Sequence, residues 1–533
     1  MKDFYKNLIN DFHIGWEKFE QLQFLNSEED VRLIISALQR KFGVVINHKY
    51  STTYISVFEV DLSEIKIRLS YRTLFCFLKL RRNDTVSLNE SFRNFTTAHH
   101  AYAIPGYCTL GILSSGDTNA FKKKCKNSFM DIISLDRDQF CRIIEAEDWV
   151  NALAGAILEE KAADVLSPYD EVGVCSREMF YGRQKETQQL LTSARQHGIA
   201  LVGSRRVGKS SMLLAVKQHC DAQGETTFFI DCESCRDVES FKNEIIKRTN
   251  IRDYEFFSGK NWNLKDYLLE RLLPQYRGTV NIFLDEIDQI VRNDARTDYA
   301  YMINPLLSAQ NESRGRLNLF FAGYKELYWS IDNNLSPLYG KTRIIELGPL
   351  DKEAATNLIV QPLRHLGFDF SNKKELLSRI LEDTNSHPAL IQLTCRLLVE
   401  YMVLVNQSVI APDHYTTVQG FTDYKDYILD TFIIATTPLE KVIILSLLEY
   451  NAFTLQDVAG ELKKTDIKLS YDRIYKEMRD LRFSGILREN NEYFLFNFPV
   501  LKAIIRRHIN VEYLIGENLR KARETADNDN PQS

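Results

Sequence analysis

The chain has 533 residues, of which 44% are hydrophobic and 26% are charged, and its formal net charge at neutral pH is −5. This composition is typical of a folded globular protein and argues against a generally basic coat for nucleic acid. Because a single core stops growing at about 250–300 residues, the length predicts three or four domains. No apolar run is long enough to span a bilayer, so we expect no membrane partner.

The cysteines and the first residues bear on the compartment. The sequence starts without the basic and then apolar layout of a secretory signal, and its nine cysteines are scattered. These features predict reduced thiols and a cytoplasmic location. Cys232 and Cys235 form the closest pair, and without a second such pair we interpret them as ordinary loop cysteines.

Residues 1–150 are predicted to form a separate domain. An amphipathic helix is expected near residues 28–42 and further helices at 88–101, 117–128 and 136–145. Strands are expected at residues 54–62, 66–70, 74–80, 108–113 and 130–135. The late alternation of strand and helix predicts a mixed α/β sheet flanked by helices.

Three segments of this domain carry a resemblance, namely Gly111–Ser115, Ala120–Lys122 and Asp131–Arg137. They resemble the restriction-endonuclease-like fold of the Mrr type, which implies an Asp and a later Glu-x-Lys that bind Mg²⁺ and activate water. Lys79 matches that lysine and Asp61 is the candidate acid, but Phe77 stands where the second acid is implied. A single carboxylate holds Mg²⁺ poorly. We therefore expect a nuclease-like module for binding or regulation, with an active nuclease as the alternative.

The stretch from Ile199 to Ser211 is the strongest functional signal in the chain. An apolar strand leads into G-x-x-x-x-G-K-S, and a predicted helix follows. The glycines let the loop N–H groups point at an anion, and the helix N-terminus adds its positive end. The motif predicts that Lys209 reaches the β- and γ-phosphates of a nucleotide and that Ser210 ligates Mg²⁺. The predicted cofactor-binding residues are Gly203, Ser204, Arg205, Arg206, Val207, Gly208, Lys209, Ser210 and Ser211.

A second apolar run, residues 280–284, ends in an acidic pair. In an NTPase this strand would place Asp285 beside the metal, and Glu286 where it orients or deprotonates the attacking water. The predicted catalytic residues are therefore Lys209, Asp285 and Glu286, and the predicted metal ligands are Ser210 and Asp285. A solvated strand end is the alternative for the acidic pair alone.

Further motifs flank these two. Phe180, Gly182 and Arg183 belong to a stretch that looks like the F-x-G-R-x-x-E box lying against the adenine in AAA+-related signalling ATPases, and a capped turn is the alternative. Lys325 follows the predicted strand 317–323 and is a candidate for sensing the γ-phosphate. The candidates for an arginine finger are Arg314, Arg316 and Arg343.

Together with Gly348–Leu350 and Ser386–Pro388, these motifs resemble the STAND/AAA+ group, which includes archaeal-type ATPases and the origin-recognition initiators. The resemblance implies ATP and Mg²⁺ as cofactors, a P-loop α/β core at residues 165–345 and a helical lid at 346–432. It also implies that His387 lies near the phosphates. A buried, hydrogen-bonded histidine is the alternative.

Residues 433–510 show a winged-helix pattern, with helices near 442–448, 455–462 and 470–483 and a two-stranded wing at 485–497. The basic residues on the third helix are Arg473, Lys476, Arg479 and Arg482. This helix is expected either to read DNA in the major groove or to act as a clamp against the nucleotide site. Residues 511–533 are predicted to be a polar tail, disordered after Ala522.

These predictions combine into a multidomain α/β protein that binds and hydrolyses ATP and changes conformation as it does so. The N-terminal domain would be its output or partner-binding module, and the nuclease-like resemblance implies a setting in prokaryotic defence or a DNA transaction. The alternatives are a DNA-binding loader of the origin-recognition sort and an ATP-gated nuclease. A homo-oligomer and a partner protein both stay open.

Overall fold

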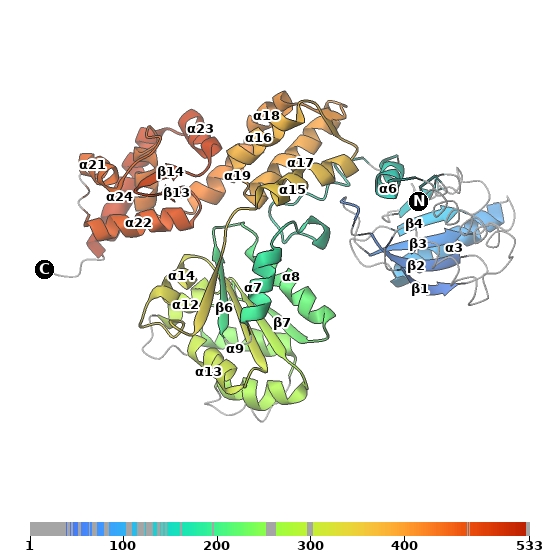
Figure 1. Cartoon of the computed structure of the whole chain (residues 1–533), viewed down its shortest axis with the longest axis horizontal. Helices are drawn as coiled ribbons and strands as arrows, with labels where there is room; N and C mark the ends of the chain where they lie inside the picture. Colours follow the sequence, from blue (N-terminus) through green and yellow to red (C-terminus); the bar gives the residue numbers. More distant parts are fainter. Residues whose placement is uncertain are drawn as a thin grey trace.

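Figure 1 shows the computed structural model of the chain. The structure describes residues 162–528 apart from 195–196, 252–262, 296–301, 466 and 468. Before residue 162 it describes residues 46–51, 55–62, 64–66, 72–78, 85–102, 109–113, 132–135 and 146–159, together with residues 39, 43, 123, 139, 142 and 143. In this part of the chain, no helix has both the length and the apolar character needed to cross a membrane.

The N-terminal part contains a five-stranded sheet in the order β1-β2-β3-β4-β5. The strands are β1 (Ile46–Ser51), β2 (Ile55–Asp61), β3 (Arg72–Leu78), β4 (Thr109–Leu113) and β5 (Ile132–Leu135). The first three pair antiparallel and the last three pair parallel. The connection from β3 to β4 includes α3 (Thr85–Tyr102), which lies against β3.

The predicted nuclease-like site falls largely outside the described residues. Asp61 ends β2, where it pairs with Arg72 of β3. Lys79 lies outside the described residues, and only the backbone is described at Phe77, in β3. The nuclease interpretation therefore stays a prediction.

The helix α6 (Trp149–Leu158) connects the N-terminal sheet with the rest of the molecule. Asp148 caps it by accepting a hydrogen bond from the Asn151 N–H at 3.0 Å. Its buried Leu153 and Ile157 belong to the same hydrophobic core as residues of the helical lid, and α6 packs against α15 (Lys352–His365). A second link is the hydrogen bond from the Lys66 N–H to His365 Nδ1, at 2.8 Å.

A parallel sheet in the order β10-β6-β9-β8-β7 forms the centre of the NTPase core, as we call residues 180–347. The strands are β6 (Gly198–Gly203), β7 (Thr226–Asp231), β8 (Val280–Asp285), β9 (Leu317–Gly323) and β10 (Thr342–Leu347). Every residue of β6, β8 and β9 is buried. Such continuous apolar strands are typical of parallel sheets covered on both faces.

Helices cover both faces of this sheet (Figure 1). They are α7 (Gln184–Ser193), α8 (Lys209–Ala222), α9 (Val238–Thr249), α11 (Leu264–Asp266), α12 (Asp288–Asp294), α13 (Ile303–Glu312) and α14 (Lys325–Asp332), with the short helical segments η2 (Tyr267–Leu272) and η3 (Leu273–Gln275). The segment η1 (Arg177–Met179) precedes the core. On the face of α7 and α8, the rings of Phe283 and Phe320 stack at 4.5 Å. Their neighbours Leu284 and Phe321 point into the opposite core cluster. Because successive side chains of a strand point to opposite faces of the sheet, each face has its own hydrophobic core.

The helical lid, residues 352–434, follows the core. Its helices are α15, α16 (Lys373–Thr384), α17 (Pro388–Leu404), α18 (Pro412–Gln419) and α19 (Thr422–Leu429), with the turn η4 (Asp430–Ile434) and the short strands β11 (Asp369–Phe370) and β12 (Val409–Ile410). Asp351 caps α15 through the Ala354 N–H, at 2.8 Å. Most of α17 is buried, and α15, α16, α18 and α19 all pack against it.

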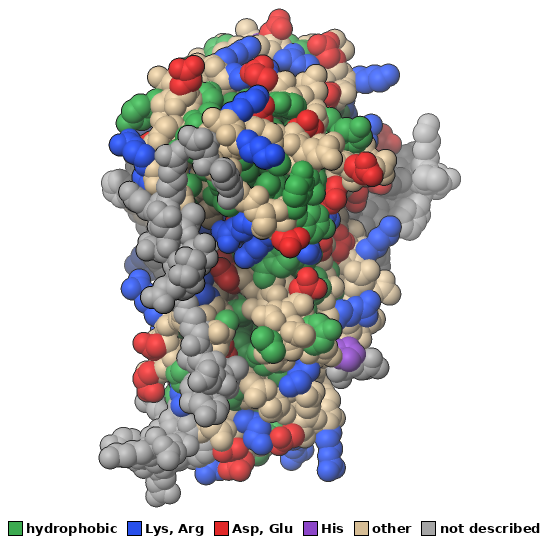
Figure 2. Space-filling view, turned by 90° about the vertical axis from the view of Figure 1, so that its left-hand side faces the viewer, with side chains coloured by type: hydrophobic (Ala, Val, Ile, Leu, Met, Phe, Trp, Pro, Cys, Tyr) green, Lys and Arg blue, Asp and Glu red, His purple; other side chains and the backbone are tan. Residues whose placement is uncertain are grey.

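The C-terminal domain, residues 438–528, has helices on both sides of a short hairpin. The helices are α20 (Pro438–Ser446), α21 (Leu455–Lys464), α22 (Tyr471–Phe483), α23 (Pro499–His508) and α24 (Val511–Asn528), and the hairpin strands are β13 (Leu487–Asn490) and β14 (Tyr493–Phe496). Figure 2 views the molecule from the side on which this domain lies. On that face the basic side chains are interspersed with acidic ones.

The end of the chain differs from the sequence prediction. We predicted a polar tail from residue 511 and disorder after Ala522, but α24 runs from Val511 to Asn528. Leu514 and Leu519 pack against the core of the domain, Ala522 is buried, and α24 lies against α20. The tail prediction is therefore wrong for these residues, because a few apolar residues on one face stabilise an otherwise polar helix by tertiary packing.

Candidate nucleotide-binding site

The phosphate loop lies between β6 and α8, at the carboxyl edge of the parallel sheet. Only glycine fits at position 203, because a Cβ there would lie 2.5 Å from the Leu347 carbonyl oxygen. Gly208, with φ +101°, stands at the start of α8 without a side-chain cap, and Arg206 also has a positive φ of 58°. The first N–H groups of α8 therefore lack a side-chain acceptor and are suited to an anion.

Lys209 is the first residue of α8 and is buried. Its Nζ donates hydrogen bonds to the carbonyl oxygens of Gly203 at 3.2 Å and Ser204 at 3.0 Å. Burial lowers the pKa of this lysine, and the carboxylates of Glu286, Asp288 and Asp285 act in the opposite direction. The ammonium group is thus held at the loop by neutral carbonyls, facing a cluster of acids.

The predicted metal ligands Ser210 and Asp285 lie together. Burial raises the pKa of Asp285, while hydrogen bonds from the Ser210 hydroxyl and the Glu286 N–H lower it. The N–H bond of Glu286 is 3.1 Å long. A hydroxyl and a carboxylate oxygen that meet beside a phosphate loop fit the all-oxygen preference of Mg²⁺. These two side chains would hold the ion beside the phosphates.

Glu286 follows the end of β8 in an unusual backbone conformation, with φ +52°. A left-handed conformation costs a non-glycine residue about 1–3 kcal/mol and persists only where the surroundings enforce it. Here the next N–H, that of Ile287, donates to the Ala322 carbonyl of β9 at 3.1 Å. The Glu286 side chain lies in the pocket, and desolvation raises its pKa while Lys209 lowers it. Such a carboxylate is suited to orienting water or accepting its proton.

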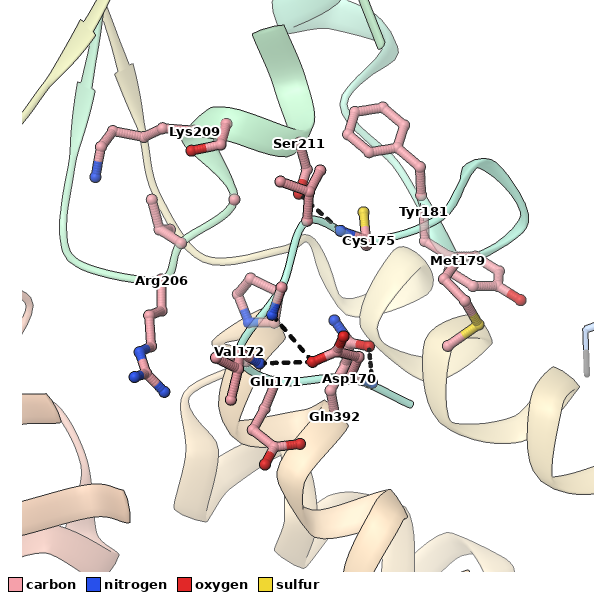
Figure 3. A pocket seen from close by; sticks show the side chains of 18 of the residues that line it. Asp170, Glu171, Val172, Cys175, Met179, Tyr181, Arg206, Lys209, Ser211 and Gln392 are labelled. Carbon is pink, nitrogen blue, oxygen red and sulfur yellow. Dashed lines mark hydrogen bonds between the residues drawn. The ribbon is translucent and has the colours of Figure 1, made fainter. Parts of the chain in front are cut away.

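A pocket of about 330 Å³ opens beside the phosphate loop (Figure 3). Of the predicted site residues it is lined by Phe180, Arg183, Arg206, Val207, Gly208, Lys209, Ser210, Ser211 and Glu286. Of the other predicted residues, Gly203, Ser204, Arg205, Gly182, Asp285 and His387 lie around it without lining it. The pocket combines a polar phosphate end with apolar residues of the lid, an arrangement expected for a nucleotide.

A segment that the sequence analysis missed closes the other side of this pocket. The residues concerned are Asp170, Glu171, Val172, Gly173, Val174 and Cys175. Asp170 Oδ1 accepts from the N–H groups of Val172 and Gly173, and the Cys175 N–H donates to Ser211 Oγ at 3.2 Å (Figure 3). The aspartate turn is a local signal visible in the sequence. Its contact with α8 joins residues 36 positions apart, which no local pattern predicts.

The lid also contributes residues that were not predicted. Leu358, Ala389 and Gln392 line the pocket, and Gln392 Oε1 accepts from the Asp170 N–H at 3.1 Å. Arg206 points away from Lys209 in Figure 3, and its guanidinium lies 4.5 Å from the Tyr427 ring centroid in α19. The phosphate loop and the lid are therefore in direct contact.

The box around Phe180 is placed by contacts with the lid. Gly182 has φ +69°, and a Cβ there would lie 2.8 Å from that of Ala354. Arg183 is buried and donates to the carbonyl oxygens of Gly348 at 2.6 Å and Pro349 at 3.4 Å. Desolvation lowers its pKa, and its partner Glu186 raises it. Arg183 thus joins the box to the loop before the lid, while Phe180 lines the pocket.

His387 connects the lid to the phosphate loop through the backbone. Its Nε2 lies 3.1 Å from the Arg205 carbonyl oxygen, which can only accept, so Nε2 carries the proton. Burial lowers the pKa of His387 to about 4, so the ring is neutral at pH 7. Phe432 and Phe498 contact its ring edge-on at 5.6 and 5.9 Å. In this conformation it is a buried, hydrogen-bonded histidine next to the loop.

The remaining candidates have other partners. Lys325 forms an ion pair with Glu440 of α20. Arg316 donates to the Leu273 carbonyl at 2.8 Å and Arg343 to Ser193 Oγ at 2.9 Å, so both hold neighbouring elements of the core. Neither these arginines nor Arg314 lines the pocket. None of the three is placed to act as an arginine finger within this chain.

Residues 166–423 match the family model of Novel STAND NTPase 1. This stretch is therefore similar to NTPases of that family. The match agrees with the loop, the acidic pair and the parallel sheet, and it supports nucleotide binding and hydrolysis. It ends before the C-terminal domain and begins after the N-terminal sheet, so it does not extend to either.

Solved structures are also similar to part of the chain. A Walker-type ATPase of Pyrococcus abyssi is 17% identical with a TM-score of 0.48, over 62% of this chain and 97% of that one. The ORC2 protein of Aeropyrum pernix, in ADPNP–ADP complexes, is 12% identical with a TM-score of 0.44, over 64% and 95%. A search of the curated proteins finds no match.

Cys175 offers a direct chemical test of the pocket. It lines the pocket and is partly exposed, whereas Cys220, Cys232, Cys235 and Cys395 are buried. Burial raises the pKa of its thiol, so labelling is best done at mildly alkaline pH. We expect ATP with Mg²⁺, at ten times its Kd, to slow alkylation of Cys175 about tenfold, because the site is then largely occupied.

Peptide-resolved mass spectrometry after N-ethylmaleimide treatment measures this rate, and the buried cysteines serve as internal references. An identical Cys175 rate with and without nucleotide, under conditions in which ATP binds, would mean that the nucleotide does not enter this pocket.

Proposed function

We propose that the chain is an ATP-binding and ATP-hydrolysing molecular switch of the STAND/AAA+ type. The observation that carries this proposal is that the C-terminal domain packs onto the same edge of the core that would contact the γ-phosphate. A domain held at that edge has a different environment when the third phosphate is present, so nucleotide state can shift its position.

The catalytic part follows from the pocket. Loop N–H groups and Lys209 would bind the phosphates, and the base would lie among the apolar side chains near Phe180 and Leu358. Ser210 and Asp285 would hold Mg²⁺, which when bound neutralises charge on the phosphoryl oxygens. Glu286 would orient the attacking water and accept its proton. Positioning and charge compensation supply most of the catalysis in phosphoryl transfer.

Contacts between α14 of the core and the C-terminal domain support a closed state. The centre of this contact is the ion pair of Lys325 with Glu440, a residue only 1% exposed. Beside it, Trp329 Nε1 donates to Asp480 at 2.6 Å, and Arg479 lies over the Trp329 ring at 4.4 Å. Buried charge pairs are costly to break one-sidedly, so they define one arrangement sharply.

The phosphate loop itself takes part in this contact. A Cβ on Gly485, which follows α22, would lie 3.2 Å from the Ser204 Cβ. Asn385 of the lid donates to Asn497 of the C-terminal domain at 2.8 Å, and Phe498 contacts His387. Lid, loop and C-terminal domain therefore meet at one place. A γ-phosphate that binds Lys325 would compete with Glu440 for the same ammonium group.

The helix α22 favours the clamp interpretation over direct DNA reading in this conformation. Arg479 is engaged with the core, where it also donates to the Tyr328 hydroxyl at 3.3 Å. Arg473, Lys476 and Arg482 are exposed, but Arg473 pairs with Glu477 and acidic residues are interspersed on that face (Figure 2). Insertion of α22 into a major groove would require its release from α14. A DNA-binding loader is therefore our second candidate function.

The N-terminal sheet is our candidate output or partner-binding module, because α6 and the Lys66–His365 hydrogen bond connect it to the lid. Its nuclease-like resemblance supports a role in prokaryotic defence or in a DNA transaction in the cytoplasm. If this module cleaves DNA, the chain would be an ATP-gated nuclease effector. A neighbouring subunit or partner protein would supply an arginine finger if hydrolysis needs one.

Charge reversal at Glu440 tests the switch. A lysine there faces Lys325, so the Glu440→Lys variant loses an attraction of about 1.5–3 kcal/mol and gains a repulsion. We expect the equilibrium between closed and open forms to shift toward the open form by roughly 10- to 100-fold. Small-angle scattering should show a larger radius of gyration, and limited proteolysis should cut faster between lid and C-terminal domain.

Glu449→Lys is the matched control, since Glu449 lies in the same domain but forms an exposed pair with Arg506. Its variant should keep the dimensions of the unaltered chain. Exchanging both charges, Lys325→Glu with Glu440→Lys, should restore them. If Glu440→Lys leaves dimensions and proteolysis unchanged in every nucleotide state, the pair does not hold the domain closed.

A further inference from the structure

Asp288, three residues after Asp285, makes contacts that play no part in the nucleotide binding and hydrolysis proposed for this chain. It is the first residue of α12, yet its carboxylate binds the start of α14. Oδ2 accepts from the Tyr324 N–H at 2.6 Å and Oδ1 accepts from the Leu327 N–H at 3.1 Å. The residue before α14, Tyr324, makes no side-chain cap of its own. Asp288 therefore caps α14 from another helix, since unpaired N–H groups at a helix start need an acceptor.

The chain approaches Asp288 closely at this point. Gly323 ends β9 beside Val202 of β6, the strand that leads into the phosphate loop. A Cβ on Gly323 would lie 2.8 Å from Asp288 Oδ2 and 2.9 Å from the Leu327 Cβ. Any larger residue would push the carboxylate away from the cap. The turn from β9 to α14 is thus built around the Asp288 side chain.

Two short segments are joined by these bonds. One carries Asp285 and Glu286, and the other carries Tyr324 and Lys325. The two bonds of Asp288 and the Ile287 N–H bond to the Ala322 carbonyl, at 3.1 Å, connect them. Because the backbone of each segment is fixed to the other, the distance between the candidate base and the first residue of α14 is fixed as well.

That first residue is Lys325, and cations gather around the ring beside it. Arg205 and Lys209 lie 5.8 Å from the Tyr324 ring centroid, and Lys325 lies 5.6 Å from it. The ring carries no charge, so these cations are not neutralised by it. In this conformation Lys325 is paired with Glu440 and Lys209 faces three carboxylates, so Lys325 becomes available to a terminal phosphate only when its pair with Glu440 separates.

We propose that Asp288 is a positioning residue for ATP hydrolysis, which fixes Lys325 opposite Glu286 so that both face the terminal phosphate. This inference rests on the proposed ATPase function and on Lys325 leaving Glu440 when ATP is bound. Asp288 does not touch the nucleotide in this account. It acts through Lys325, by holding the start of α14.

The test compares single and double variants in the full chain. Asp288→Ala should lower kcat for ATP roughly 10- to 100-fold, because small displacements of positioned groups cost that much. The KM and the Kd for ATP should stay within about twofold, since the loop and Lys209 are unaltered. Asp288→Asn keeps one oxygen acceptor, so its kcat should fall less than that of Asp288→Ala. Lys325→Ala should lower kcat as far as Asp288→Ala does, and the double variant should lose no more than Lys325→Ala alone.

A matched control exists on the same two helices. Arg292 of α12 and Glu326 of α14 form an exposed ion pair at 2.8 Å, which links the helices without capping α14. Glu326→Ala should therefore keep kcat. If Asp288→Ala does not fold, Asp288→Asn decides the question by the same comparison.

The outcomes distinguish a failure of the proposed ATPase function from a failure of the positioning role of Asp288. An unaltered chain that neither binds nor hydrolyses ATP contradicts the proposed function itself. An active unaltered chain with unchanged kcat in Asp288→Ala, or a double variant whose losses multiply in full, overturns the positioning role. An equal loss in Glu326→Ala would show that any loosening of α14 suffices and would also overturn it.

Discussion

The Lys209→Ala variant is expected to bind ATP roughly 100- to 10,000-fold more weakly than the unaltered chain. In the proposed complex, the ammonium group makes two charge-assisted hydrogen bonds to phosphate oxygens, each of about 1.5–3 kcal/mol. Arg206 does not replace it, because its guanidinium group points away toward Tyr427. Calorimetric titration of the full chain with ATP and Mg²⁺ measures the loss.

The structure indicates that this loss will not come from unfolding. Without nucleotide, Lys209 is buried and donates to the neutral carbonyls of Gly203 and Ser204, and burial lowers its pKa by more than Glu286, Asp288 and Asp285 raise it. A buried ammonium group of this kind carries a desolvation cost, so its removal should leave the melting temperature near that of the unaltered chain.

Lys217→Ala is the matched control for Lys209→Ala. Lys217 lies on the same helix two turns further along and forms a surface ion pair with Asp221 at 2.7 Å. Its variant should bind ATP with unchanged affinity, since exposed pairs of this kind contribute little. Equal affinities of the Lys209→Ala variant and the unaltered chain would contradict nucleotide binding by the loop.

The parts of the site that could be predicted from sequence are those whose geometry is local. The phosphate loop is one continuous stretch from strand to helix, and Asp285 and Glu286 directly end a strand. In such segments the motif fixes the backbone, and the structure places Lys209, Ser210 and Asp285 together. The parallel α/β core follows from the same apolar strands.

The parts that could not be predicted depend on contacts between distant residues. The turn at Asp170 could be predicted from the sequence. Its position across the pocket depends on hydrogen bonds with Ser211 and Gln392, which are distant in the chain. Asp288 is the third acidic residue of the stretch Asp285–Asp288, yet only the folded chain shows that it caps α14. The basic pattern on α22 likewise did not reveal that Arg479 faces Trp329.

The second large effect is expected at Glu286. Glu286→Gln should lower kcat for ATP roughly 100- to 1000-fold, in the range typical of lost general-base catalysis. Its Kd for ATP should change little, because Lys209 and the loop N–H groups stay in place. The variant would thus hold ATP without hydrolysing it, the opposite of Lys209→Ala, which should fail to bind. Single-turnover hydrolysis together with equilibrium binding separates the two.

Glu233→Gln is the matched control, because Glu233 is an exposed carboxylate near enough to influence the pKa of Glu286. It should keep kcat close to that of the unaltered chain. Hydrolysis by Glu286→Gln at the unaltered rate would assign the water-orienting role to another residue.

The pH dependence adds an independent check on Glu286. Desolvation raises its pKa, with Lys209 acting in the opposite direction. A base must be ionised to act, so kcat should fall on acidification at a higher pH than an ordinary glutamate would give, and Glu286→Gln should lack this step. The pH dependence of folding stability runs in the opposite direction to that of kcat. A carboxyl whose pKa is higher in the folded chain contributes stability below its unfolded pKa and loses it as pH rises through the folded value.

At neutral pH the ionised Glu286 therefore opposes folding, and its strained backbone, with φ +52°, adds to that cost. Glutamine keeps the shape and removes the charge, so the variant should melt at the same temperature or higher. Lost hydrolysis in a chain that is at least as stable and binds ATP normally can only come from the chemical step. A variant that is inactive and also less stable at pH 7 would instead assign Glu286 a structural role.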